Sequence, residues 1–252
     1  MATWRRCATR PESSDLARPC TSPYGERRLR EARAAGRKLG GDRVRLGLLG
    51  FPDGGLEQLL QAHWWRDVPE RSPTTGAVRP PYPEALDRSV AYDGDDLRRE
   101  LERVLRETRP TTVAFPDPLD RHPDHSATGV FVLLALGDRL ARDGRVPRLL
   151  AYLVHWPGWP PGWDDPQPAP EARERPLELP PDLPDRGLAR VALPLSRTEI
   201  DGKAAALECY VTQQEVMSSL LAAFVRRTEP FTVFTVAEVR GVGSTIQRKA
   251  RR

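Results

Sequence analysis

Residues 111–142 read TTVAFPDPLDRHPDHSATGVFVLLALGDRLAR and combine a short apolar run, a polar turn and a longer apolar stretch. The run at 111–115 is apolar and rich in β-formers, which is typical of a buried strand. Residues 126–142 have the length and apolar content of a helix, and Pro123 is suited to the first turn of one. We therefore predict a strand that leads through a turn into a helix, which is the basic step of an α/β fold.

The rest of the chain repeats this alternation of apolar runs and helical stretches. Further strands are predicted at 44–50, 149–156, 191–195 and 231–236, and further helices at 25–39, 56–64, 95–108 and 197–227. Each strand–helix step is within reach of a right-handed crossover. The pattern therefore predicts an α/β domain with a mainly parallel sheet flanked by helices.

Charge and cysteine content argue against several classes of protein. The 39 Lys and Arg residues are interspersed with 35 Asp and Glu, for a net charge of +4, so we expect no basic field for nucleic acid. Three cysteines without regular spacing predict neither a disulfide framework nor a thiolate metal site. No apolar run approaches the roughly 18 residues of a membrane span, and residues 1–20 lack the apolar core of a secretory signal. We expect a soluble, cytoplasmic protein that binds neither nucleic acid nor membranes.

The 26 prolines suggest how the domain is organised. Because proline disrupts helix interiors and central strands, the Pro-rich stretches at 66–94 and 157–186 are predicted to be loops. Residues 1–23 show no apolar periodicity and are predicted to form a loosely held arm. The folded domain is expected to cover 24–240, and 241–252 to form a flexible tail.

The motif His122-Pro123-Asp124-His125 lies between the predicted strand at 111–115 and the helix after it. Ligands of open α/β sheets gather at the carboxyl ends of strands, so this is a favourable place for a site. Two histidines three residues apart can share one face of a helical turn, and imidazole is the usual nitrogen ligand of zinc. Spacing alone leaves a zinc site and an ordinary helix cap as equal alternatives.

The segment FPDPLDRHPDHSATG resembles the second signature of the PIG-L (LmbE-like) deacetylase family. Other segments are similar to family patterns and occur in the same order, so that the resemblance covers about residues 25–235. These segments are Arg28-x-x-Glu31 with Ala35 and Leu39-Gly40, Leu49-Gly50-Phe51-Pro52-Asp53-Gly54, Tyr152-Leu153-Val154-His155, the helix from Lys203 to Gln213 with Thr212 in place of a serine, and Phe224-Val225-Arg226 with Glu229-Pro230-Phe231.

The resemblance implies a Rossmann-like scaffold and a zinc-dependent hydrolase that removes an acetyl group from an N-acetylated sugar or related amide. In that family His125 would be a zinc ligand, and His122 would stabilise the oxyanion or supply a proton. Asp124 would orient a histidine. Arg28 and Asp53 would contact hydroxyl groups of the substrate, a small N-acetyl sugar conjugate. Nothing in the sequence predicts the oligomeric state.

The sequence departs from the family at its beginning. The family starts with a strand that ends in H-P-D-D-E and supplies two more zinc ligands and the general base, and this motif does not occur here. The first histidine is His63, in an unrelated setting. A catalytic zinc ion needs about three protein ligands, and the recognisable motifs supply one. The sequence as given therefore predicts weak zinc binding and little activity.

Three explanations of this departure stay open. The first is that the gene is read from too late a start, so that the strand lies upstream. The second is that the chain is a degenerate, non-catalytic member of the family that acts as a binding protein, or a truncated product. The third is that other residues complete the site; the candidates are Asp117, Asp120 and His155, although a histidine at a strand end is more often packed than functional.

Overall fold

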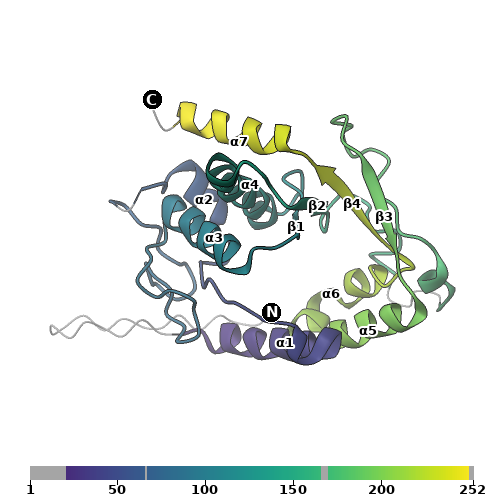
Figure 1. The fold of residues 1–252 in the computed structure, drawn as a ribbon. Helices are drawn as coiled ribbons and strands as arrows, with labels where there is room; N and C mark the ends of the chain where they lie inside the picture. Colours follow the sequence, from purple (N-terminus) through teal and green to yellow (C-terminus); the bar gives the residue numbers. More distant parts are fainter. Residues whose placement is uncertain (1–20, 66, 166–169, 250–252) are drawn as a thin grey trace.

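The computed structural model describes residues 21–65, 67–165 and 170–249 (Figure 1). It confirms a mixed α/β fold, in which helices flank a four-stranded sheet. The elements in chain order are α1 (Pro23–Gly40), η1 (Gly41–Arg43), α2 (Leu56–Gln61), α3 (Gly94–Thr108), β1 (Thr112–Pro116), α4 (Pro123–Asp143), β2 (Arg148–Tyr152), η2 (Pro170–Glu174), β3 (Arg190–Pro194), α5 (Arg197–Glu208), α6 (Val211–Ala223), β4 (Thr228–Phe234) and α7 (Val236–Lys249). The arm predicted at 1–23 lies mostly outside the described residues.

The sheet has the strand order β1-β2-β4-β3 and is only partly parallel. β1 and β2 run parallel, with Thr112 opposite Arg148 and Pro116 opposite Tyr152, and α4 makes the crossover between them. β4 is antiparallel to both β2 and β3. The prediction of a mainly parallel sheet is therefore corrected. One helix between two strands favours parallel pairing, whereas two consecutive helices, α5 and α6, separate β3 from β4.

The segment at 44–50 does not form the buried strand that its sequence predicts. Leu48 forms an isolated bridge with Ala85, while Val44 and Leu46 are 43% and 50% exposed. A strand requires a neighbour for its backbone hydrogen bonds, and among the described residues this segment pairs only at Leu48, whose carbonyl oxygen accepts from Leu86 N–H (2.8 Å). Among the described residues, β1 is therefore an edge strand that pairs only with β2.

Two predicted helical boundaries also differ from the structure. The long helix expected at 197–227 is divided into α5 and α6, with Cys209 and Tyr210 between them. Residues from 241 onward were expected to be a flexible tail, but α7 continues to Lys249. α7 packs against α4, which stabilises a helix whose own sequence predicts it weakly.

The main core lies between the sheet and α4. Its largest buried members come from the two parallel strands, α4 and β4, and include Phe115, Leu133, Leu136, Leu149 and Phe234. Burial of each such side chain contributes about 1.5–3 kcal/mol relative to an exposed one. A second group of helices, α1, α5 and α6, packs together on the other side of the molecule in Figure 1.

A close approach of α4 to β1 fixes the start of α4. A Cβ atom at Gly129 would lie 2.3 Å from the carbonyl oxygen of Pro116, the last residue of β1. Glycine therefore allows the helix to lie directly against the strand end. The result is that the first turn of α4, which carries the histidine motif, is held at the carboxyl end of β1.

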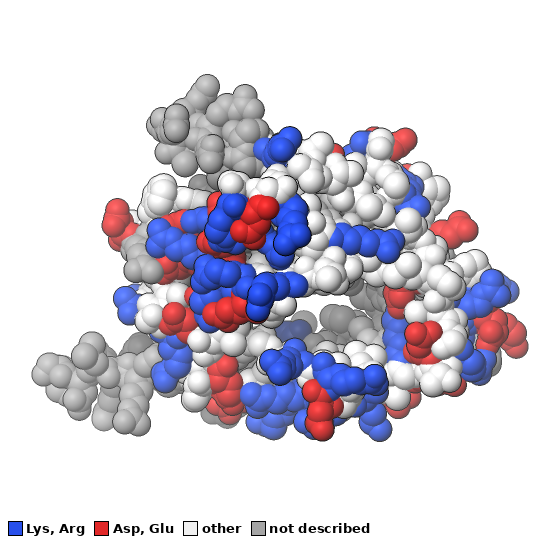
Figure 2. All heavy atoms as spheres, viewed as in Figure 1, with Lys and Arg blue, Asp and Glu red and all other residues white. Residues whose placement is uncertain are grey.

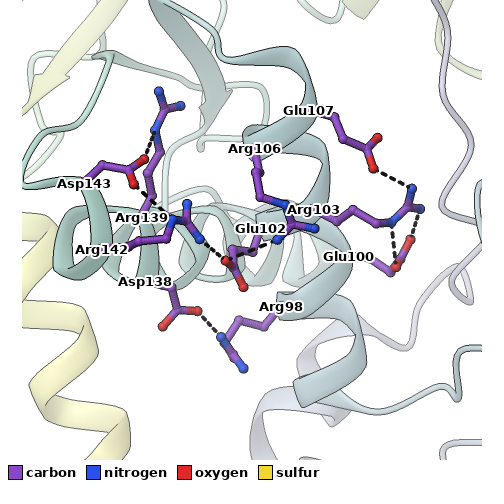
Figure 3. Close-up of polar contacts among 10 residues, drawn as sticks. All are labelled: Arg98, Glu100, Glu102, Arg103, Arg106, Glu107, Asp138, Arg139, Arg142 and Asp143. Atoms are coloured by element: carbon purple, nitrogen blue, oxygen red, sulfur yellow. Dashed lines mark hydrogen bonds and ion pairs between the residues drawn. The ribbon is translucent and has the colours of Figure 1, made fainter.

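Ion pairs link α3 and α4 at the surface (Figure 3). Arg98 of α3 pairs with Asp138 of α4, and Arg142 of α4 pairs with Glu102 of α3. Exposed pairs contribute about 0.2–1 kcal/mol each, so they support a contact made mainly by apolar packing. Figure 2 shows basic and acidic side chains mixed on this face, and a hollow between α1 and the α3–α4 side. No helix among the described residues is long and apolar enough to cross a membrane.

Candidate active site

The candidate site is built where β1 and β2 end side by side. After the last paired residues, Asp117 N–H donates to Tyr152 O (2.7 Å) and Arg121 N–H donates to His155 O (2.9 Å). These bonds hold the two loops together beyond the sheet. They place the loop that leads into α4 beside the residue that follows β2.

His122 is the N-cap of α4. Its Nδ1 accepts a hydrogen bond from Asp124 N–H at 3.3 Å, in the way a serine or aspartate oxygen usually does. A ring that accepts at Nδ1 carries its proton on Nε2 when it is neutral. The cap therefore fixes both the position of His122 and its tautomer, and it leaves an N–H donor on the other side of the ring.

Asp120 organises the loop around the histidines. Its carboxylate is fully buried and accepts hydrogen bonds from the backbone N–H groups of His122 (2.9 Å), Val154 (2.8 Å) and His155 (3.0 Å). Oδ1 also lies 3.4 Å from Nδ1 of His125. Burial acts to raise the pKa of Asp120, but the contacts with His125 and the three amides outweigh it and lower that pKa. Asp120 is therefore ionised and joins both strand ends to α4.

Three histidine rings meet beside this carboxylate. The ring centroids are 4.7 Å apart for His122 and His125, 5.3 Å for His122 and His155, and 5.1 Å for His125 and His155. Burial lowers the pKa of His155; Asp120 opposes this effect, and the two other histidines add to it. His155 was one of the residues left open by the sequence, and the structure brings it to the histidine pair.

Asp124 holds a second loop at the site through hydrogen bonds to its backbone. Its carboxylate accepts from Gly54 N–H (2.6 Å) and Leu56 N–H (3.1 Å), which belong to the Pro-Asp-Gly turn and the start of α2. This contact places Asp53 at the site. The carboxylate that faces a histidine is that of Asp120, while Asp124 contacts His122 through its backbone amide. The role expected of the Asp124 side chain in orienting a histidine stays a prediction.

Arg28 reaches the site from α1 and is held by α6. With its amide oriented to satisfy both neighbours, Gln213 accepts from Nε (3.1 Å) and Nη2 (2.8 Å) of Arg28 and donates to Glu31 (3.3 Å). Glu31 is buried and also accepts from the hydroxyl of Thr212 (2.6 Å). The sequence patterns contain Gln213 but assign it no role, and its position beside Arg28 is visible only in the fold.

All five residues predicted for the site line one cavity of about 710 Å³. The cavity thus brings together Arg28, Asp53, His122, Asp124 and His125 from α1, the turn before α2, and α4. His155 lines it as well, and so do two residues that sequence reasoning did not assign, the ion pair of Lys203 and Glu229. Asp117, another candidate from the sequence, is instead paired with Arg186 at 2.7 Å.

The residues present do not form a complete metal site. In the described part of the chain, no group of three or more His, Cys, Asp or Glu residues is arranged to hold a metal ion. Nδ1 of His122 is occupied by the Asp124 amide, and Nδ1 of His125 is buried beside Asp120 without a hydrogen-bond partner. The zinc ligation that the resemblance implies for His125 therefore stays a prediction.

Comparisons with known proteins address the family. A search of curated proteins and a search of solved structures found no match. The family model PIG-L, described as GlcNAc-PI de-N-acetylase, matches residues 6–136. This match covers just over half of the 252 residues and includes all five predicted site residues. The chain therefore belongs to the PIG-L family.

Proposed function

We propose that the chain is a hydrolase that removes the acetyl group from an N-acetylated sugar conjugate. Membership of the PIG-L family suggests a deacetylase-type activity. The observation that carries the proposal is the cavity in which His122, fixed as an Nε2–H donor, lies with Arg28 and Asp53. One end of this cavity can polarise an amide, and polar side chains beside it can bind hydroxyl groups.

His122 has the chemistry needed to stabilise the transition state of amide hydrolysis. As water adds to the carbonyl carbon, negative charge develops on the carbonyl oxygen, and an N–H donor held in place lowers the energy of that state. The Nε2–H of His122 is oriented in advance by the bond to Asp124 N–H. Because Nδ1 of His122 accepts from Asp124 N–H, loss of the Nε2 proton would leave an imidazolate; His122 is therefore assigned the role of a hydrogen-bond donor, and the leaving amine takes its proton from the attacking water.

Arg28 and Asp53 are proposed to bind the sugar. Gln213 restricts the Arg28 guanidinium, so fewer rotamers are lost when Arg28 contacts a hydroxyl group. The turn that carries Asp53 is fixed by the Asp124 carboxylate. Both side chains are therefore positioned by the same residues that hold the histidines.

Zinc would polarise the carbonyl and activate water if it were bound, with His125 as a ligand. Because the described residues do not assemble a set of ligands, no step is assigned to the metal. We expect purified protein to contain well under one zinc ion per chain. The cytoplasmic location expected from the sequence likewise remains a prediction.

Acetate release tests the proposed function. The full chain is incubated with methyl N-acetyl-β-glucosaminide, and acetate is measured against His122→Ala at the same concentration. We expect slow release that the substitution abolishes, with the fold confirmed by circular dichroism. If the glycoside binds but acetate release equals that of the variant, the chain is a binding protein and the proposal fails.

A further inference from the structure

Part of the wall of the cavity is apolar. This part is formed by Leu207 of α5, by Met217, Leu220 and Leu221 of α6, and by Phe224 after α6. Pockets that enclose drug-sized ligands measure about 300–1,000 Å³, and this cavity of about 710 Å³ falls within that range. The histidines and the apolar wall belong to the same cavity, so one ligand can contact both.

The apolar side chains of α6 that line the cavity lie outside the hydrophobic core clusters. Among its described residues only Thr212 and Ala223 are buried. Met217, Leu220 and Leu221 are half-buried and belong to none of the hydrophobic clusters found among the described residues. Water contact with such side chains is unfavourable, and an apolar ligand group would relieve it. A sugar ring covered with hydroxyl groups would not.

Four of the charged side chains that line the cavity have partners within the protein. Lys203 is paired with Glu229, and the Arg28 guanidinium already donates to the Gln213 oxygen. The Asp124 carboxylate is occupied by two backbone amides. A phosphate group is bound best by cations that can turn their donors to it. The cavity therefore favours an uncharged ligand over a phosphate-linked one.

We propose that the substrate is an uncharged N-acetylhexosaminide whose aglycone is an alkyl or aryl group seated against α6. This inference rests on the proposed function, because that function places the acetamide at the histidines. The sugar then lies between Arg28 and Asp53, and the aglycone extends toward Met217 and Leu221. The wall of α6 would select the substrate, and the histidine end would carry out the reaction.

A chain-length series tests the inference without altering the protein. The full chain is titrated calorimetrically with methyl, butyl and hexyl N-acetyl-β-glucosaminides below their micelle concentrations. Each methylene that reaches the wall should raise the affinity up to about fourfold, so hexyl should bind at least about tenfold more tightly than methyl. Hexyl β-glucoside, which lacks the acetamide, should bind more weakly than its N-acetylated counterpart.

Variants locate the aglycone. Leu221→Asn and Met217→Gln should remove most of the preference for hexyl over methyl and leave methyl binding unchanged. The matched control is Val216→Asn, on the same helix, because Val216 is 75% exposed and does not line the cavity. This control should keep the full preference. Thermal melts identify any variant that fails to fold, and the chain-length series stands without the variants.

The outcomes separate this inference from the proposed function. Equal affinity for methyl and hexyl glycosides, with His122-dependent acetate release retained, overturns the apolar subsite alone. Hexyl binding that Val216→Asn weakens as much as Leu221→Asn does also overturns it. If no glycoside binds and no acetate is released, the proposed function fails together with the inference.

Discussion

At the scale of single residues, one buried carboxylate and one capping imidazole determine the geometry of the site. Asp120 binds the amides of His122 and His155, which are 33 residues apart in the sequence and adjacent in the fold. His122 caps α4 with a ring nitrogen, so the usual N-cap contact also sets its tautomer. The motif at 122–125 identifies the histidines, but their grouping depends on Asp120.

Substitution of the two motif histidines should have different effects. His122→Ala should abolish acetate release without changing the small amount of zinc in the purified protein. His125→Ala should reduce that zinc further, because His125 is the ligand implied by the family resemblance. Elemental analysis and acetate assays on both variants check this. Equal loss of zinc in both would contradict the separate roles, and one tightly held zinc ion per chain in the unsubstituted protein would contradict the expected weak binding.

Asp120→Asn should destabilise the protein by about 1–3 kcal/mol, because charged acceptors contribute more to buried hydrogen bonds than neutral ones do. In the variant, the N–H₂ group of the new asparagine would also face backbone N–H groups, which are donors and need an acceptor. Chemical denaturation measures the change. The control is Asp143→Asn, whose carboxylate is partly exposed and forms surface ion pairs with Arg139 and Arg142. A loss no larger than that of the control would show that Asp120 does not organise the loop.

At the scale of elements, local sequence predicts what depends on local contacts. The helices at 25–39 and 95–108 and the strand at 111–115 are confirmed within a few residues, because periodicity and caps define them. The run at 44–50 has strand-like composition, but a strand forms only when a neighbouring strand pairs with it. The residues of the run do not indicate whether such a neighbour is present. α7 is the opposite case, a weak local signal supported by packing against α4.

Two glycines of α4 should respond differently to substitution by alanine. Gly129→Ala puts a methyl group against the carbonyl of Pro116, and the resulting strain should cost about 1–3 kcal/mol. At Gly137 the nearest atom to a new Cβ is 3.9 Å away, so Gly137→Ala should be neutral or stabilise the helix by up to about 1 kcal/mol. Thermal denaturation compares them. Equal stability of the two variants would contradict the close contact between α4 and β1.

At the scale of the whole molecule, the cavity lies between two groups of elements that are distant in the sequence. The strand ends and α4 supply the histidines, while α1 and α6 supply Arg28 and its partner Gln213. The five predicted residues could be named from motifs because each motif is local. The apolar wall and Gln213 could not, because their function arises only when α6 packs beside α1.

The contact between α1 and α6 depends on a buried hydrogen bond. Thr212→Val keeps the side-chain volume but removes the hydroxyl that donates to Glu31, which should cost about 1–3 kcal/mol and weaken glycoside binding through Arg28. Thr212→Ser keeps the hydroxyl and should retain both properties. Denaturation and calorimetric titration check the pair. If the serine variant is as impaired as the valine variant, the hydroxyl is not the important group.

The most direct test of the account is acetate release from an N-acetylhexosaminide by the full chain, with His122→Ala as its matched control. The account predicts slow release by the unsubstituted protein and none above background by the variant, which should still fold and still bind the glycoside. The same rate in both proteins, or no release from a folded protein that binds the glycoside, would contradict it.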